Sequence, residues 1–517
     1  MAEPKLGTDV KVAFFLSVTL IVIAALVNSG GLAWALAPFF VSGILFAIWR
    51  APLRYSILTL MFFAFTLENP NELPANGYWQ SPLFPIGTIM FVHIKNMTGV
   101  SFLFLSGMEY LLIFLGLVAL IRRSTGSKID QVGRVPTPRP LLRLALVSLT
   151  STLLVWIHGL ATGGDFSKSL WQVEKVIYLP IVFLVCSVGL RGSKDHVALG
   201  KVLLTAAVYR AAFAFYVKQT VVVPVDPNTG EAILAYATSH HDSMLFASAC
   251  VLLLLLIVER AGKRFVRLAA LVLPLLIVGM ISNNRRMVWV QVGLVFFTLY
   301  LATPPNPIKR KVKKILLYLS PLIAAYFVVG WNSKAGIFKG AQMARSVVEP
   351  STDASSLWRE IENYDILFTF RSAPILGHGY GHPFWEIIPL PAVGYDLEQY
   401  CPHNSILGLW AFCGYFGFTG LVLLWAAGAY FAMRAYHASR IPLDRTAAVL
   451  CLGAVIIYMV QCYGDMGLGS WTGVFILGPS IAIAGKLAGA TGAWGSQRKR
   501  REGDEGPART APATSAS

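Results

Sequence analysis

The chain has 517 residues, 56% of them hydrophobic and 13% charged, and a formal net charge of +17. This composition excludes a soluble globular protein with a polar surface. The apolar runs have the roughly 20 residues that a helix needs to cross a hydrocarbon core about 30 Å thick, whereas short alternating strand segments are lacking. The predicted fold class is therefore all-α, a polytopic integral membrane protein with about 12–14 transmembrane helices.

Apolar length and the distribution of lysine and arginine predict fourteen spans. In chain order they cover residues 12–28, 32–49, 54–67, 100–121, 142–161, 170–190, 197–217, 243–258, 266–282, 287–302, 314–331, 404–432, 446–463 and 472–489. The predicted regions are a cytoplasmic N-terminus at 1–11, eleven helices within 12–331, a large outer loop at 332–403, three helices within 404–489 and a disordered basic cytoplasmic tail at 490–517. The run at residues 84–91 could be re-entrant and change the number of spans by one or two.

The charge of each loop predicts its side of the membrane. If the N-terminus lies inside, every strongly basic loop falls on the cytoplasmic side, as the positive-inside rule requires. The segments 68–99, 218–242, 283–286 and 332–403 then lie outside. The surplus of positive charge is thus explained by the orientation of the chain in the membrane. We expect the lipid bilayer as a partner, and no nucleic acid.

The cysteines and histidines carry no recognisable metal motif. Six cysteines lack any paired C-x-x-C spacing, so no zinc or redox site is predicted. Cys401 could pair with Cys413 or Cys462, although small buried thiols are the more common arrangement. The run His240-His241-Asp242 resembles a metal cluster, but consecutive residues cannot all ligate one ion unaided, and the chain has no Asp-x-Asp pair. We therefore expect neither a metal ion nor another cofactor.

The ionisable groups near the predicted outer face are few, and several are arginines. Arg210 lies in the outer half of the seventh span, and Arg359 lies in the large outer loop. Arg285 and Arg286 lie in a hairpin so short that both stay at the outer membrane surface. Arginine binds phosphate oxygens bidentately and stays charged, which suits a diphosphate. An interfacial arginine can equally anchor the protein to lipid headgroups.

Histidine and lysine join the arginines at this face. His403 opens the twelfth span, where a histidine can take a proton from an attacking hydroxyl at neutral pH, or can simply cap or pack a helix start. Glu174 and Lys175 lie in the outer turns of the sixth span, and their adjacency predicts side chains about 100° apart that do not face each other. The glycines at 377–381 predict a tight turn or a close backbone approach rather than a phosphate-binding loop.

The order of these elements resembles the O-antigen ligase and polymerase superfamily. The elements are an arginine-bearing hairpin at 282–287, Ser356-x-x-Arg359, Pro374-x-x-Gly377-x-Gly379-x-Gly381, His403-Asn404-Ser405 and Gly414-x-x-Gly417. The resemblance covers residues 200–435. Two positions depart from the family pattern. Cys413 stands where an acidic residue often precedes the first glycine of the pair, and His240-His241-Asp242-Ser243 stands where an Asp-Pro-Asn-like element commonly opens the eighth span.

The resemblance implies a metal-independent, GT-C-like glycosyltransferase of the bacterial inner membrane. Such an enzyme transfers a glycan from an undecaprenyl diphosphate-linked donor to a glycan or lipid-linked acceptor at the periplasmic face. Arg210 with Arg285 or Arg286 would hold the donor diphosphate, and His403 would orient or deprotonate the acceptor hydroxyl. Arg359 would support the loop or the acceptor.

The predicted catalytic residues are therefore His403, Arg210 and Arg286, and the predicted substrate-binding residues are Arg285, Arg359, Lys175, Asn404 and Tyr380. A polymerase is slightly favoured over a ligase because it needs lipid-linked substrates of one kind only. The alternative is a transporter or flippase of lipid-linked saccharides, which would call for discontinuous helices near the midplane and related halves. The polar residues gather on one side of this chain, and that distribution favours an enzyme working at that face.

Overall fold

The computed structural model describes residues 32–68, 83–131, 133–192, 194–220, 237–303, 307–333, 335–349, 354–390 and 399–495. The predicted N-terminus, the first predicted span and residues 496–517 of the predicted tail lie outside these ranges. Within the described residues the regular secondary structure is helical, apart from one isolated bridge between His93 and Ser106. The prediction of an all-α fold is confirmed.

The α-helices, in chain order, are α2 (Leu32–Arg50), α3 (Leu53–Leu67), α4 (Phe84–Phe91), α5 (Ile94–Thr98), α6 (Gly107–Ser124), α7 (Arg139–Ala161), α8 (Phe166–Gly189), α9 (His196–Thr220), α10 (Asp242–Val258), α11 (Lys263–Asn283), α12 (Met287–Ala302), α13 (Pro307–Gly330), α14 (Lys339–Val348), α15 (Ala354–Ser372), α16 (Ser405–Ala438), α17 (Pro442–Gly464) and α18 (Trp471–Ala490). Two 3-10 turns, η1 (Gly336–Phe338) and η3 (Gly467–Gly469), precede α14 and α18.

Eight helices of the described chain are long and apolar enough to cross a membrane, namely α7, α8, α9, α11, α16, α17, α18 and the part Lys309–Gly330 of α13. Four shorter apolar helices occupy Phe39–Arg50, Leu53–Leu67, Asp242–Val258 and Met287–Ala302. The protein is thus a multi-pass membrane protein. Each predicted span within the described residues overlaps a helix, while the side of the membrane on which each loop lies stays a prediction.

The predicted span at 100–121 begins too early. The structure starts α6 at Gly107, because Ser106 and Glu109 form a capping box there: the Ser106 backbone N–H donates to Glu109 Oε2 at 2.7 Å, and the Glu109 N–H donates to Ser106 Oγ at 3.4 Å. The apolar residues upstream of this cap therefore lie outside the helix. Residues 84–91 form α4, whose eight residues are too few to cross a bilayer.

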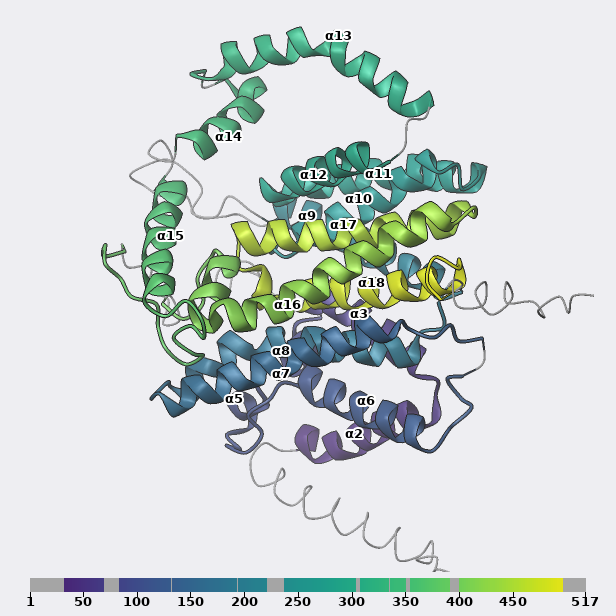
Figure 1. Cartoon of the computed structure of the whole chain (residues 1–517), viewed down its shortest axis with the longest axis vertical. Helices are drawn as coiled ribbons and strands as arrows, with labels where there is room; N and C mark the ends of the chain where they lie inside the picture. The colour runs from purple at the N-terminus through teal and green to yellow at the C-terminus, as the bar shows by residue number, and fades with distance from the viewer. Residues whose placement is uncertain are drawn as a thin grey trace, which may run out of the picture.

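The core of the molecule is a set of helices packed side by side, with α16 against α7, α17 and α18, and α8 against α7 and α18 (Figure 1). Small residues allow some of these contacts. A side chain at Gly420 of α16 would place its Cβ 2.2 Å from Ser151 Oγ of α7, so glycine is required for the approach. Helix α15 lies across one end of this bundle, and α13 lies beyond the bundle with its main contacts to α14 and η1 (Figure 1).

Candidate functional site

The start of α16 positions His403. Asn404 is the N-cap of this helix, and its Oδ1 accepts a hydrogen bond from the Leu407 N–H at 3.2 Å. The carbonyl oxygen of His403 accepts a hydrogen bond from the Met466 N–H at 2.7 Å, which ties this turn to the loop between α17 and α18. Asn404, predicted to bind substrate, is 3% exposed and caps the helix.

The imidazole of His403 is held by two residues of α15. Glu362, which is fully buried, accepts hydrogen bonds from the His403 N–H at 3.0 and 3.2 Å, and its Oε1 lies 3.3 Å from Nδ1 of the ring. The ring of Trp358 packs edge-on against the imidazole with centroids 4.7 Å apart. A carboxylate at Nδ1 favours the tautomer whose Nε2 accepts a proton, so the arrangement suits a general base.

Asp465, which directly follows α17, lies near several of the predicted cationic residues. It is 7% exposed, and Arg359 Nη2 lies 3.8 Å from its Oδ1. Burial raises the pKa of Asp465, but the electrostatic influence of four neighbours outweighs burial and holds the pKa below its usual value. These neighbours are His240, Arg359, Arg285 and His403. Of the predicted residues, Arg359 thus contacts this carboxylate, and Arg285 and His403 lie close enough to influence its ionisation.

The hairpin between α11 and α12 presents Arg285 and Arg286. Asn284 ends α11 in a left-handed conformation, with φ of 53°. Asn283 is 1% exposed and anchors the hairpin, since its Oδ1 accepts from the Thr238 hydroxyl at 3.1 Å and its Nδ2 donates to the Ser239 carbonyl at 3.1 Å. Arg285 is half-buried and acts electrostatically on Asp465, whereas Arg286 is exposed.

Arg210 lies in a separate buried ion pair. Its Nε lies 3.0 Å from both carboxylate oxygens of Asp242, and its Nη2 lies 2.8 Å from Oδ2. The guanidinium also packs over the Phe213 ring, 5.3 Å from the centroid. Both members of the pair are at most 4% exposed. The positive charge of Arg210 is therefore neutralised by Asp242 inside the protein, and Arg210 is not one of the four neighbours that influence Asp465.

The residues His240, His241 and Asp242 are directed to different partners. Asp242 pairs with Arg210, whereas His241 Nδ1 lies 3.4 Å from Oε1 of Glu68. Burial, together with the positive potential of His241, lowers the pKa of His240 to about 3, so this ring is neutral at physiological pH.

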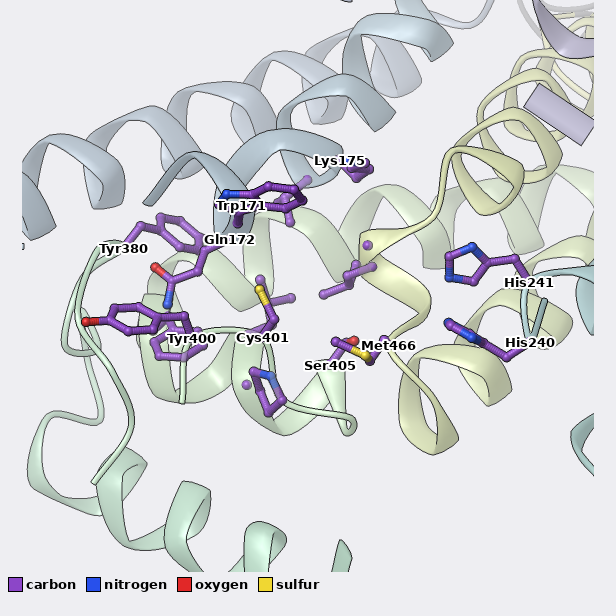
Figure 2. A pocket seen from close by; sticks show the side chains of 17 residues that line it. Trp171, Gln172, Lys175, His240, His241, Tyr380, Tyr400, Cys401, Ser405 and Met466 are labelled. Atoms are coloured by element: carbon purple, nitrogen blue, oxygen red, sulfur yellow. The ribbon is translucent and has the colours of Figure 1, made fainter. Parts of the chain in front are cut away.

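A cavity of about 310 Å³ opens beside these groups. Figure 2 shows its labelled side chains: Trp171, Gln172, Tyr380 and Tyr400 lie at one end, His240 and His241 at the other, and Cys401, Ser405 and Met466 between them. Lys175 and Tyr380, both predicted to bind substrate, line this cavity. The imidazole of His403 lies outside the lining, while its neighbours Pro402 and Ser405 belong to it.

The prediction that Glu174 and Lys175 do not face each other is wrong. Lys175 Nζ lies 2.5 Å from Glu174 Oε2. The 100° between adjacent positions applies to the Cα–Cβ directions, and both side chains are long enough to bend toward each other. Lys175 also packs over the Trp471 ring, 5.4 Å from its centroid.

The glycines at 377–381 make close backbone contacts, as predicted, and the loop that they form contributes Tyr380 to the cavity. Gly379 has φ of 84°, its N–H donates to the Phe412 carbonyl at 2.9 Å, and a Cβ at this position would lie 2.2 Å from Gly159 Cα. The loop is therefore wedged between α7 and α16. Tyr380 follows within it and is 2% exposed.

The cysteines within the described residues are all free thiols, which excludes both pairings considered for Cys401. Cys401 lines the cavity, but burial raises the pKa of its thiol to about 12. It is protonated at neutral pH and is therefore a poor nucleophile.

Two acidic residues of the site, Glu362 and Asp465, were missed by the sequence analysis. A weak signal existed for Glu362, because it lies three residues after Arg359 and so shares its helical face. Asp465 lies in a turn between the last two predicted spans, and only the tertiary structure brings it to Arg359.

Residues 271–422 match a protein-family model described as O-Antigen ligase. The matched segment contains the arginine hairpin, Arg359, Glu362, the glycine loop, His403 and Gly414-x-x-Gly417. No curated protein matches the chain.

Proposed function

We propose that this chain, whose residues 271–422 match the family model described as O-Antigen ligase, transfers a glycan from an undecaprenyl diphosphate-linked donor to a sugar hydroxyl at the periplasmic face. The family supports glycan transfer in general; the donor, the acceptor and the membrane side are our assignments. The observation that carries the proposal is the pairing of His403 with buried Glu362 next to a group of arginines.

We assign the proton transfer to His403. Its Nε2 accepts the proton of the acceptor hydroxyl as the hydroxyl oxygen forms a bond to the anomeric carbon of the donor sugar. The bond between that carbon and the diphosphate oxygen breaks, and the electron pair leaves with the diphosphate. Glu362 holds the ring through Nδ1 and stabilises the imidazolium that forms.

We assign the leaving group to the arginines. Arg359 contacts Asp465, Arg285 acts electrostatically on the same carboxylate, and exposed Arg286 follows Arg285 in the hairpin, so we assign these three guanidinium groups to the diphosphate. A diphosphate gains negative charge as the glycosidic bond breaks, and preorganised guanidinium groups stabilise that charge in the transition state. In this proposal the arginines supply the positive charge that a divalent cation supplies in metal-dependent transferases.

The remaining predicted residues support the site. Arg210 neutralises Asp242 at the start of α10 and so fixes the turn that carries His240, rather than contacting the donor. Asn404 caps α16 and aligns His403. Lys175 and Tyr380 line the adjoining cavity. The same apparatus serves a polymerase or a ligase, since the two differ in the acceptor and share the chemistry.

The test is glycan transfer by purified protein in liposomes with a lipid diphosphate donor and a chelator present. We expect transfer by the wild type, none by His403→Ala and unchanged transfer by His437→Ala, which alters an exposed histidine at the other end of α16. Thermal unfolding establishes that each variant is folded. Full activity of a folded His403→Ala variant, or transfer that needs added metal, contradicts the assignments.

A further inference from the structure

The two ends of the cavity differ in chemistry. In Figure 2 the imidazoles of His240 and His241 lie at one end, and the rings of Trp171 and Tyr400 lie at the other. His240 also acts electrostatically on Asp465, so its end of the cavity adjoins the arginines assigned to the diphosphate. The aromatic end lies away from those charges.

The two aromatic rings at the far end are each contacted by a side chain outside the cavity lining. Lys168 Nζ lies 5.5 Å from the centroid of the Tyr400 ring, and the His93 ring lies 5.3 Å from that of Trp171. Such contacts restrict the rings to one orientation before any ligand arrives. Trp171 nevertheless keeps 44% of its surface exposed.

An exposed tryptophan at the end of a membrane helix often belongs to an interfacial aromatic belt. Trp171 differs from a belt residue because it borders a cavity whose lining includes residues of the 400–405 turn, of α16 and of the loop after α17. Phe166 provides the comparison. It lies on the same end of α8, is 52% exposed and stacks on Trp156, but it does not line the cavity.

We propose that the aromatic end of this cavity is a saccharide subsite, in which a pyranose ring packs against Trp171 and Tyr400 while the phosphate-bearing group lies toward His240. The inference rests on the proposed glycan transfer and assigns a binding place within it. One face of a pyranose carries C–H groups with slight positive charge, which pack favourably on the negative face of an aromatic ring. The neighbouring side chain of Gln172 is committed to the glycine loop, since it bonds to the Gly381 N–H and the His382 carbonyl.

Either the donor glycan or the acceptor glycan can supply this ring, and steady-state kinetics distinguish the two. We expect Trp171→Ala to raise KM for one of the two substrates roughly threefold to tenfold with little change in kcat, and Trp171→Phe to restore most of the affinity. An increase in donor KM alone places the donor sugar there, and an increase in acceptor KM alone places the acceptor. Phe166→Ala should leave both KM values unchanged.

A binding measurement separates this inference from the proposed function. The probe is the size-fractionated oligosaccharide that mild acid releases from the lipid-linked pool of the producing cells. Saturation transfer from detergent-solubilised protein to this probe should be strong for the wild type and for His403→Ala, and weak for Trp171→Ala and Tyr400→Ala. Equal transfer to all four proteins, or equal KM values for wild type and Trp171→Ala, overturns the subsite. A wild type without glycan transfer overturns the proposed function instead, whatever the probe does.

Discussion

The substitution Glu362→Gln tests whether a buried carboxylate orients the base. Glutamine keeps the size of the side chain and retains one oxygen that can accept from the His403 N–H, but it removes the negative charge next to Nδ1. A hydrogen bond to a charged group contributes about 1.5–3 kcal/mol. If about 2–3 kcal/mol of that is felt only when the imidazolium forms, kcat falls roughly 30-fold to 160-fold at 1.36 kcal/mol per tenfold.

The matched control lies on the same helix. Glu360 is exposed and two residues away, so Glu360→Gln removes the same charge without touching His403. The assay is single-turnover transfer from a lipid diphosphate donor, with thermal unfolding of each variant in the same detergent. We expect a lower kcat with nearly unchanged KM for Glu362→Gln, and wild-type kinetics for Glu360→Gln.

Two results would refute this reasoning. A folded Glu362→Gln variant with wild-type kcat would mean that the carboxylate does not assist proton transfer. Equal losses in the Glu362 and Glu360 variants would mean that the net charge of α15, rather than contact with the imidazole, controls the rate.

Three further outcomes follow from the geometry. Arg285→Gln should raise KM for the diphosphate donor at least tenfold, because a charged hydrogen bond of about 1.5–3 kcal/mol is lost; an unchanged donor KM would remove this residue from the diphosphate site. Burial lowers the pKa of His240 from the ordinary 6.5 to about 3. Below pH 6.5 the unfolded chain therefore binds a proton that the folded protein does not bind. The free energy of unfolding consequently falls as the pH drops from 6.5 toward 3. The loss between pH 6.5 and 5 is roughly 1.5–2 kcal/mol, so over this range the unfolding temperature of His240→Asn should fall less than that of the wild type; an identical fall contradicts the burial of the ring. Gly379→Ala should lower the unfolding temperature far more than Gly163→Ala, because both have positive φ but only the former would place a Cβ against the backbone of α7; equal losses in thermal scans would contradict this packing.

The helices were predictable because membrane spans are specified by composition over about 20 residues, without reference to the rest of the chain. The residues at which the helices begin and end were less predictable. The start of α6 depends on the capping box of Ser106 and Glu109, which lies within an otherwise apolar stretch. The close approach of the glycine loop was predictable in kind, but Gly159 and Phe412 as its partners were not.

Some residues of the candidate site were likewise predictable from the sequence, and others were not. His403, Arg285 and Arg359 were predictable because ionisable groups near an apolar boundary are conspicuous in the sequence. Their acidic partners are specified by tertiary contacts. Glu362 lies 41 positions before His403 in the sequence, and Asp465, which follows α17, contacts Arg359 of α15. The pairing of Arg210 with Asp242 joins α9 to α10 and gives this arginine a partner that sequence alone did not reveal.

The most direct test of the central claim is to quantify both reaction products, the new glycosidic bond and the released lipid diphosphate, for the wild type in sealed liposomes. For each glycan transferred, the account predicts one new glycosidic bond by mass spectrometry and one released undecaprenyl diphosphate, both abolished in a folded His403→Ala variant. The lengths of the products then separate a polymerase from a ligase. Donor that crosses the bilayer with its diphosphate linkage intact and no new glycosidic bond would contradict the claim and identify the protein as a transporter.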